Sequence, residues 1–521
     1  MTTSGIHTSR QLLMGELIRR VAHKTPKQSA FVYENTKITY KDMERRVLHL
    51  AGWLQKVGIE IGEKIGIISK NNLSFVEIVF AVASSGAVSV PINFRLAADE
   101  FVYVINNSDT KILFIEKEYE ETIRLNQQQM PNLEKVIIID TNQSEWAVSY
   151  PSIFEDKVTF NDLSHILSDE DDCMICYTSG TTGFPKGAVL SHKNLLLSAL
   201  NSIVDSKIAN GNKQLTITPL FHIAGIGNII ISCTVGGTTY IQREFNPVRV
   251  LETIHKEKIV GLFLVPAMWN MIMQVPTIEK YDLTSVERCS TGAAICPLVT
   301  KKQMMKHFPN AGIFDAFGQT EMSPTTTCLL PEDSLRKTNS VGKPVLNVEV
   351  RVVDENMNDV PLGEIGEIVY RGPTLMKGYY KNPEATEEAF KGGWFHSGDL
   401  VQMDDEGFIY VVDRKKDMII SGGENIYPAE IEAVLYKHES ILEAAVVGVA
   451  DEKWGESVKA YVVLKKGKEL GEEEIIAFCK EHLASYKKPK YVEFINELPR
   501  NPSGKILKRI LREGAKVTLT D

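Results

Sequence analysis

Short apolar runs alternate with helical patterns over the first four hundred residues of the chain. The run KIGIIS at 64–69 predicts a buried strand, residues 73–85 predict a helix, and residues 87–92 predict a second strand. The same alternation of strands and helices returns further along, at residues 111–115, 135–140, 238–242, 247–256, 259–265 and 267–273. Such a rhythm predicts α/β layers with mostly parallel sheets.

The pattern changes twice towards the C-terminus. Between residues 341 and 370 apolar and polar positions alternate, which favours an antiparallel barrel or meander. Beyond the charged segment 413–417, a compact βαβ-like pattern begins, and a short polar segment between two self-contained patterns is a natural domain boundary. We therefore expect an α/β fold: a large N-terminal domain of α/β layers with a small β-barrel-like region (1–413), a hinge (414–417), and a small mobile α+β lid domain (418–521).

Bulk composition narrows the function classes. At 521 residues, with 43% hydrophobic and 24% charged residues, the chain suits a globular protein of more than one domain. A net charge of -9 argues against a nucleic-acid partner. No apolar run reaches transmembrane length, and the N-terminus lacks the pattern of a signal peptide. Seven scattered cysteines suit a reducing compartment, so we expect a cytoplasmic protein.

A loop rich in Ser, Thr and Gly carries the strongest chemical signal. It runs from Tyr177 to Lys186, with the sequence YTSGTTGFPK. Such a loop offers backbone N–H groups, hydroxyls and one cation to a polyphosphate, and its glycines let the backbone approach closely. The usual P-loop pattern is not met, because Pro185 precedes the lysine and Gly187 follows it. ATP is the leading ligand.

A second block, DAFGQTE at 315–321, complements this loop. Phe317 can stack on a flat base, Thr320 offers a hydroxyl to a phosphate, and Glu321 offers a hard oxygen to Mg²⁺. Taken alone, a core phenylalanine in a turn explains the block better. Further blocks stand at 219–225 (PLFHIAG), 292–294 (GAA), 393–399 (GWFHSGD), 412–417 (VDRKKD) and 498–506 (LPRNPSGKI).

Together these blocks resemble, in content and order, the adenylate-forming superfamily of acyl-CoA synthetases, peptide-synthetase adenylation domains and luciferases. The resemblance covers roughly residues 15–510 and is most like bacterial fatty-acyl-CoA or aryl-CoA ligases. It implies ATP and Mg²⁺ as cofactors and coenzyme A as a co-substrate. The ATP- or AMP-binding residues that it implies are Thr178, Ser179, Gly180, Thr181, Thr182, Gly183, Lys186, Gly292, Ala293, Ala294, Asp315, Phe317, Gly318, Thr320, Asp399, Arg414 and Lys505.

Within this set the resemblance implies distinct tasks. Lys505 is expected to be the catalytic lysine, acting with Lys186, Thr320 and Glu321. Glu321 is the expected magnesium ligand, together with Thr178. Phe317 stands where the family more often has Tyr. Phenylalanine keeps the stacking surface for adenine and lacks only the hydroxyl.

The resemblance also implies an acyl pocket and a moving lid. The implied pocket residues are His222, Gly225, Ile226, Gly292, Gly318, Met322 and Ser323. Lys416 matches the hinge about which the lid alternates, and Ser421, Gly422 and Gly423 match the tunnel for the pantetheine arm of CoA. No Lys or Arg stands among the pocket residues, which disfavours a second carboxylate on the substrate, and Gly292 and Gly318 are expected to leave space for an acyl group.

The expected reaction is an ATP-dependent acid–thiol ligation. A carboxylic acid is activated as acyl-AMP with release of pyrophosphate and then transferred to CoA, and a medium- or long-chain fatty acid leads as substrate. An aryl acid of the benzoate or cinnamate kind remains open, as do loading of a carrier-protein phosphopantetheine and a nucleotide-binding regulator without catalysis. The resemblance leaves a peripheral membrane contact open, and the sequence does not give the oligomeric state.

Overall fold

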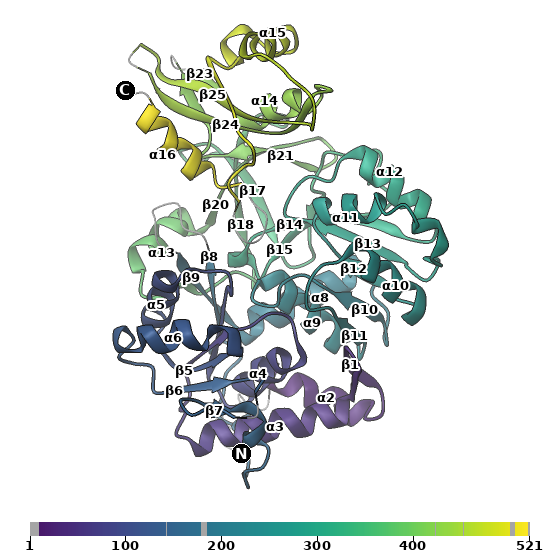
Figure 1. The fold of residues 1–521 in the computed structure, drawn as a ribbon, viewed down its shortest axis with the longest axis vertical. Coiled ribbons are helices and arrows are strands. Elements are labelled where there is room, and N and C mark those ends of the chain that lie inside the picture. Colours follow the sequence, from purple (N-terminus) through teal and green to yellow (C-terminus); the bar gives the residue numbers. More distant parts are fainter. Residues whose placement is uncertain are drawn as a thin grey trace. The chain divides into compact units, whose positions relative to one another are not determined.

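A computed structural model describes residues 10–141, 143–178, 185–421, 424–451, 453–500 and 506–518. Its chain divides into two compact units (Figure 1). The first contains Met1–Val350 and Tyr370–Phe395, and the second contains Arg351–Val369 and His396–Asp521. Each unit is described by itself below.

Two sheets organise the first unit. Among the described residues, one sheet has the order β19 (Gly378–Tyr379), β9 (Lys186–Ser191), β8 (Asp172–Thr178), β4 (Val88–Ile92), β3 (Lys64–Ile68), β5 (Thr110–Ile115), β6 (Lys135–Ile138) and β7 (Val148–Ser149). The strands from β4 to β7 are parallel to their neighbours, whereas β8, β9 and β19 form antiparallel pairs. The buried runs at 64–69, 87–92 and 111–115 are thus the parallel strands that their patterns predict.

The other sheet of the first unit has the order β16 (Lys343–Pro344), β15 (Thr325–Leu329), β14 (Gly312–Gly318), β13 (Arg288–Gly292), β12 (Gly261–Phe263), β10 (Lys213–Thr216), β11 (Thr238–Ile241), β1 (Ser29–Tyr33) and β2 (Thr36–Thr39). Its central strands are parallel, and β14 pairs with β15 in antiparallel fashion. Because the carboxyl end of β13 lies beside that of β14, Gly292 pairs with Ala316.

Helices connect these strands. They are η1 (Met14–Glu16), α2 (Leu17–Lys24), α3 (Tyr40–Lys56), α4 (Leu73–Ser84), α5 (Ala98–Asn107), η2 (Lys117–Tyr119), α6 (Glu120–Asn126), η3 (Gln127–Gln129), α7 (Tyr150–Ile153), α8 (His192–Asp205), α9 (Ile223–Thr234), α10 (Pro247–Glu257), α11 (Pro266–Met273), η4 (Ile278–Lys280), α12 (Leu298–His307), η5 (Thr320–Met322), α13 (Pro383–Ala389) and η6 (Lys391–Gly393). Helix α4 begins where Asn72 accepts a hydrogen bond from the Phe75 amide, and α8 begins where Ser191 accepts one from Asn194.

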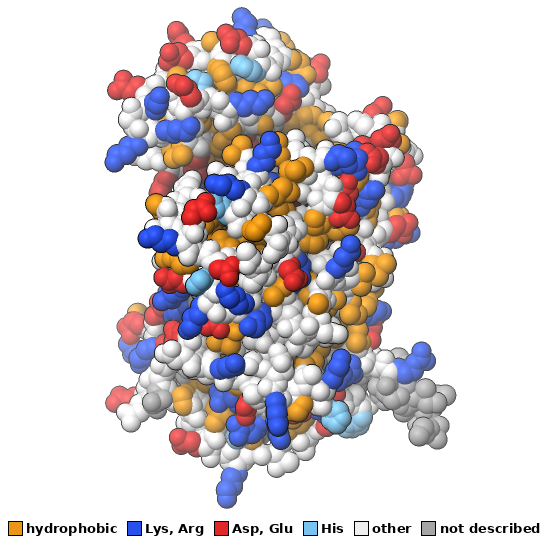
Figure 2. Space-filling view, turned by 90° about the vertical axis from the view of Figure 1, so that its right-hand side faces the viewer, with side chains coloured by type: hydrophobic (Ala, Val, Ile, Leu, Met, Phe, Trp, Pro, Cys, Tyr) orange, Lys and Arg blue, Asp and Glu red, His pale blue; other side chains and the backbone are white. Residues whose placement is uncertain are grey.

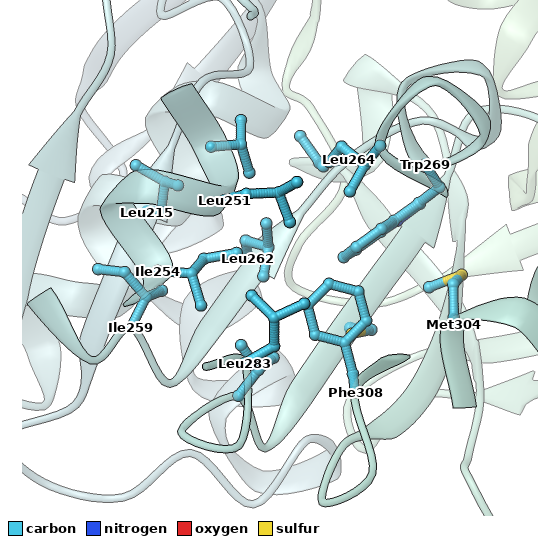
Figure 3. Close-up of a cluster of buried hydrophobic side chains, with 14 of the residues drawn as sticks. Leu215, Leu251, Ile254, Ile259, Leu262, Leu264, Trp269, Leu283, Met304 and Phe308 are labelled. Carbon is cyan, nitrogen blue, oxygen red and sulfur yellow. The ribbon is translucent and has the colours of Figure 1, made fainter. Parts of the chain in front are cut away.

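A dense apolar core packs against strands that carry candidate site residues at their ends. Helices α10, α11 and α12 bury side chains against β10, β12 and β13 (Figure 3). Trp269 and Phe308 meet edge to face with ring centroids 5.6 Å apart, and the Trp269 indole donates to the Ser290 carbonyl at 3.2 Å. This contact fixes β13 two residues before Gly292.

The second unit contains two further sheets. One has the order β17 (Glu349–Val353), β18 (Gly366–Arg371), β20 (Phe395–Met403) and β21 (Ile409–Arg414), and it accounts for the alternating pattern after residue 341. The other joins β23 (Glu424–Ile426), β22 (Ile419–Ser421), β25 (Gly455–Leu464) and β24 (Ile441–Asp451), with β26 (Tyr491–Phe494) beside β25. Its helices are α14 (Pro428–Leu435), α15 (Glu472–His482), η7 (Ser485–Lys487) and α16 (Lys508–Thr518).

Candidate active site

The phosphate-loop candidate is bounded by an antiparallel pair of strands. Thr178, the last residue of β8, is paired with Lys186, the first of β9. Gly187 lies against Tyr177, where a Cβ would come 3.1 Å from Cζ of the Tyr177 ring. The strands therefore bring both ends of the loop together. Ser179, Gly180, Thr181, Thr182 and Gly183 lie outside the described residues.

Glu321 lies on the turn η5, directly after β14. Its side chain is buried, and Oε1 accepts a hydrogen bond from the Tyr379 hydroxyl at 2.8 Å. Glu321 also adds to the effect of burial in raising the pKa of the Cys176 thiol of β8 to about 12. The structure thus brings the predicted magnesium ligand to the strands that carry Thr178 and Lys186.

Tyr379 is a site residue that the sequence motifs missed. Its ring lies 5.1 Å from the Lys186 ammonium, while its hydroxyl donates to Glu321. Burial raises the pKa of Tyr379, with Glu321 acting in the same direction, so the hydroxyl keeps its proton and donates. No spacing rule connects positions 379 and 321. The two residues meet because β19 pairs with β9.

The candidate residues for binding the adenine base lie on β13 and β14. Asp315 and Phe317 are two residues apart on β14 and so share one face of the sheet. Asp315 pairs with the fully buried Lys301, whose Nζ lies 2.5 Å from Oδ2 and donates to the Thr338 carbonyl at 3.0 Å. Burial raises the pKa of Asp315 and the Lys301 cation opposes that rise. Lys301 was not predicted, since a lysine in a helical pattern is usually solvated.

The block that follows β13 adopts an unusual backbone. Ala293 has a φ of 66°, in the left-handed region that glycine occupies more readily. Ala293 and Ala294 are exposed, whereas Gly292 is buried. A strained residue at the carboxyl edge of a parallel sheet is where ligand-binding segments concentrate.

The presence of glycine at the positions assigned to the acyl pocket has another explanation. A Cβ on Gly318 would lie 1.9 Å from the Pro324 carbonyl oxygen, and one on Gly292 would lie 2.6 Å from the Ala316 carbonyl oxygen. Gly225 would place a Cβ 2.3 Å from the Pro219 carbonyl oxygen. Close backbone approach explains all three positions. The expectation that Gly292 and Gly318 leave space for an acyl chain is therefore not needed to account for them.

His222 caps helix α9. Its Nδ1 accepts from the Ala224 amide at 3.2 Å, which assigns the ring proton to Nε2 when the imidazole is neutral. Burial lowers the pKa of His222 and favours that neutral form. Of the other pocket candidates, Ile226 and Met322 are buried, and the buried Ser323 hydroxyl donates to the Thr374 carbonyl at 2.9 Å.

The second unit brings together two candidates that sequence could not connect. Asp399 on β20 is the register partner of Arg414 on β21, and Arg414 Nε lies 2.7 Å from Asp399 Oδ1. Lys416 follows in a turn closed by a hydrogen bond from the Asp417 amide to the Arg414 carbonyl. Burial lowers the pKa of Lys416. Ser421 ends β22, while Gly422, Gly423 and Lys505 lie outside the described residues.

The residues of the first unit fit a magnesium–nucleotide ligand. A carboxylate has about four lone-pair sites, and Tyr379 takes one of those of Glu321. The Lys186 cation contacts the same tyrosine ring, and the buried Gln319 Nε2 has no partner among the described residues. Glu321 would hold the metal, and Lys186 would face the phosphates.

The comparisons with known proteins agree with this geometry. Residues 18–380 match the AMP-binding enzyme family, and residues 430–505 match its C-terminal domain. This chain belongs to the AMP-binding enzyme family. It is 36% identical over 494 residues to a feruloyl-CoA synthase from Amycolatopsis sp, covering 95% of this chain and 97% of that protein.

Two further members of the family span nearly the whole chain. The long-chain-fatty-acid–CoA ligase FadD13 of Mycobacterium tuberculosis is 34% identical over 522 residues, covering 97% of this chain and 99% of the relative. The O-succinylbenzoate CoA synthetase (MenE) of Bacillus subtilis, solved in complex with ATP and magnesium ion, superimposes with a TM-score of 0.85 at 28% identity, covering 96% and 99% of the two chains.

Family membership settles the reaction type. The chain is an AMP-forming acid–thiol ligase, an acyl-CoA synthetase in the broad sense, and it uses ATP, Mg²⁺ and CoA. The expected fold of a large α/β unit with a smaller C-terminal part is confirmed. On the face shown in Figure 2, acidic and basic side chains are interspersed. Within the described part of the chain, none of the helices has the length and apolar character needed to cross a membrane.

Proposed function

We propose that this enzyme activates an apolar monocarboxylic acid, with a medium- or long-chain fatty acid as its substrate. The observation that carries the proposal is the character of the candidate pocket residues, none of which is a lysine or arginine. A second carboxylate would be desolvated there without a partner, at a cost of several kcal/mol. The 34% identity to a long-chain-fatty-acid–CoA ligase supports an aliphatic acid.

An aryl acid is the second candidate. The 36% identity to a feruloyl-CoA synthase supports it, and a flat aromatic ring is as free of charge as an alkyl chain. The glycines of the pocket do not separate the two, since neighbouring backbone atoms account for them.

We assign the chemistry of the first half-reaction to four residues. Lys186 and Thr320 would contact the phosphates, and Glu321 would hold the magnesium ion that neutralises them. Lys505 would neutralise the charge that gathers as the carboxylate attacks the α-phosphorus. In the second unit, Asp399 would accept from the ribose hydroxyls, and Arg414 is held beside it by their ion pair.

We assign the second half-reaction to the lid. The hinge at Lys416 would let residues 418–521 alternate, and the segment at Ser421, Gly422 and Gly423 would line the path of the pantetheine arm. Small residues suit the close passage of such an arm.

An acid panel tests the proposal. The purified enzyme is given MgATP and one acid at a time, and release of AMP is followed with and without CoA. CoA-dependent turnover on C8–C18 fatty acids supports the proposal and sets the chain length. Turnover only on ferulate- or benzoate-like acids replaces the substrate class with the second candidate. Pyrophosphate release without CoA-dependent AMP release on any acid would direct the search to a carrier-protein thiol.

A further inference from the structure

Tyr379 lies between the two charged groups that we assign to the phosphates and the metal. The Lys186 ammonium is 5.1 Å from the centre of its ring, and its hydroxyl donates to Glu321 Oε1 at 2.8 Å. A lysine over an aromatic face is held by the ring quadrupole, and a hydrogen bond to a carboxylate fixes the direction of that carboxylate. One side chain thus contacts both groups.

The backbone of Tyr379 is held on two sides. It pairs in register with Ala188 of β9, and its amide donates to Thr386 Oγ1 of α13 at 2.9 Å. Gly378, with a φ of 151°, packs against Thr386, where a Cβ would lie 2.8 Å from Cγ2. Ring and hydroxyl are therefore carried by a fixed element rather than by a free loop.

We propose that Tyr379 is the positioning residue that sets the orientation of the Glu321 carboxylate and of the Lys186 ammonium for magnesium-bound ATP. The proposal rests on the proposed function for the roles of Glu321 and Lys186. In this proposal the Tyr379 hydroxyl orients Glu321, which would hold the metal, and the Tyr379 ring orients Lys186, which would face the phosphates. The two tasks are separable, because phenylalanine keeps the ring and leucine keeps neither group.

Tyr380, the next residue, provides a matched control. Its hydroxyl also donates to a carboxylate, Asp109 Oδ2 at 2.9 Å, and its ring also lies near a lysine, Lys64 at 4.9 Å. Tyr380 lies in the turn that follows β19, and its hydroxyl and ring contact Asp109 and Lys64 rather than Glu321 and Lys186. Tyr380→Phe and Tyr380→Leu therefore remove the same kinds of contact elsewhere.

The experiment is isothermal titration of the full-length enzyme with ATP, once with excess Mg²⁺ and once with EDTA. We expect Tyr379→Phe to weaken binding of Mg²⁺-ATP by about ten- to a hundredfold, the usual cost of losing a partner of a metal ligand. Binding of metal-free ATP should stay at the wild-type value. Tyr379→Leu should weaken both, and both Tyr380 variants should bind as the wild type does.

The outcomes separate this proposal from the proposed function. Wild-type affinity of Tyr379→Phe for Mg²⁺-ATP would overturn it, and so would an equal loss in magnesium and in EDTA. If Tyr379→Leu does not fold, Tyr379→Phe still decides the metal side and carries the test. Since the titration contains no acid and no CoA, a wild type that turns over none of the acids would refute the substrate assignment and leave this measurement valid.

Discussion

Lys505 acts, in our assignment, on charge that exists only while the acid attacks the α-phosphorus. Its replacement by alanine removes one preorganised cation, and loss of such a donor lowers the rate by about a hundred- to a thousandfold. We expect that fall in acid-dependent exchange of pyrophosphate into ATP, with the stability of the protein unchanged. Lys490, an exposed lysine paired with Asp451 at 2.6 Å, gives the control, because its alanine variant should exchange at the wild-type rate. Equal rates for the Lys505 and Lys490 variants would contradict the assignment.

Gly318 tests whether the pocket glycines serve the backbone or the substrate. An alanine there places Cβ 1.9 Å from the Pro324 carbonyl oxygen, which forces the backbone to move. We expect Gly318→Ala to lower the free energy of unfolding by about 1–3 kcal/mol, as overpacking does. The matched control is Gly227→Ala in α9, where the nearest atom would be 3.8 Å away and a gain in helix propensity is expected. Unchanged stability of Gly318→Ala, with a changed acid preference, would return Gly318 to the pocket.

Single residues could be predicted from sequence where a motif carries them. Thr320, Glu321 and Lys186 could be proposed because they stand in motifs that resemble those of a known family, and their roles stay predictions. Tyr379 and Lys301 could not be found that way, because each contacts a residue distant along the chain. Tyr379 contacts Glu321, 58 positions away, because β19 pairs with β9, and Lys301 of α12 contacts Asp315, 14 positions away, because this helix packs against β14.

The N-terminal segment is attached to helix α8 through a buried histidine. His192 begins α8, and its Nδ1 accepts from the Met14 amide at 3.2 Å. Burial lowers the pKa of His192 to about 4, although Asp169, Asp171 and Asp172 act in the opposite direction. The buried ring stays neutral in the folded state, whereas the solvated ring of the unfolded chain binds a proton near its ordinary pKa, so acid favours the unfolded chain.

We therefore expect a pH effect on stability between the unfolded and the folded pKa of this group. Its contribution is present above about pH 6.5, the ordinary value, and is lost as the pH falls towards 4. The loss is roughly 3 kcal/mol, from the difference between the two pKa values. His192→Asn keeps an acceptor for the Met14 amide but does not titrate. Urea unfolding of both proteins between pH 7.5 and 4.5 should show the wild type losing stability faster, and parallel curves would contradict this origin.

The type and ends of the helices were predicted better than the way in which the strands pair. The helices expected at 73–85 and 247–256 are α4 and α10, with ends that differ by one residue at most. The C-terminal pattern predicted a βαβ-like region, and β24 and β25 instead form a long antiparallel pair. Local periodicity gives the type of each element, whereas the direction of pairing depends on contacts between distant residues.

For the whole molecule, the hinge at 414–417 stays a prediction. The compact units divide the chain at other places and leave this segment inside the second unit, while the family's C-terminal domain matches residues 430–505. Asp417 pairs with Arg512 of α16 at 2.8 Å, so the turn is attached to the part of the chain that the lid comprises. A hinge needs a backbone that can change its φ, and contacts in one state do not report that freedom.

Lys416→Pro examines this freedom directly. Proline fixes φ near −65°. The chain can then adopt only one of the two conformations that alternation of the lid requires. We expect adenylation, measured as pyrophosphate exchange, to stay close to the wild-type rate, and transfer from acyl-AMP to CoA to fall by about a hundredfold, the cost of misplaced reacting groups. Lys416→Ala removes the same ammonium and leaves the backbone free, so both steps should resemble the wild type. Equal losses of both half-reactions in Lys416→Pro would contradict alternation about this residue, and the same losses in Lys416→Ala would assign them to the side chain.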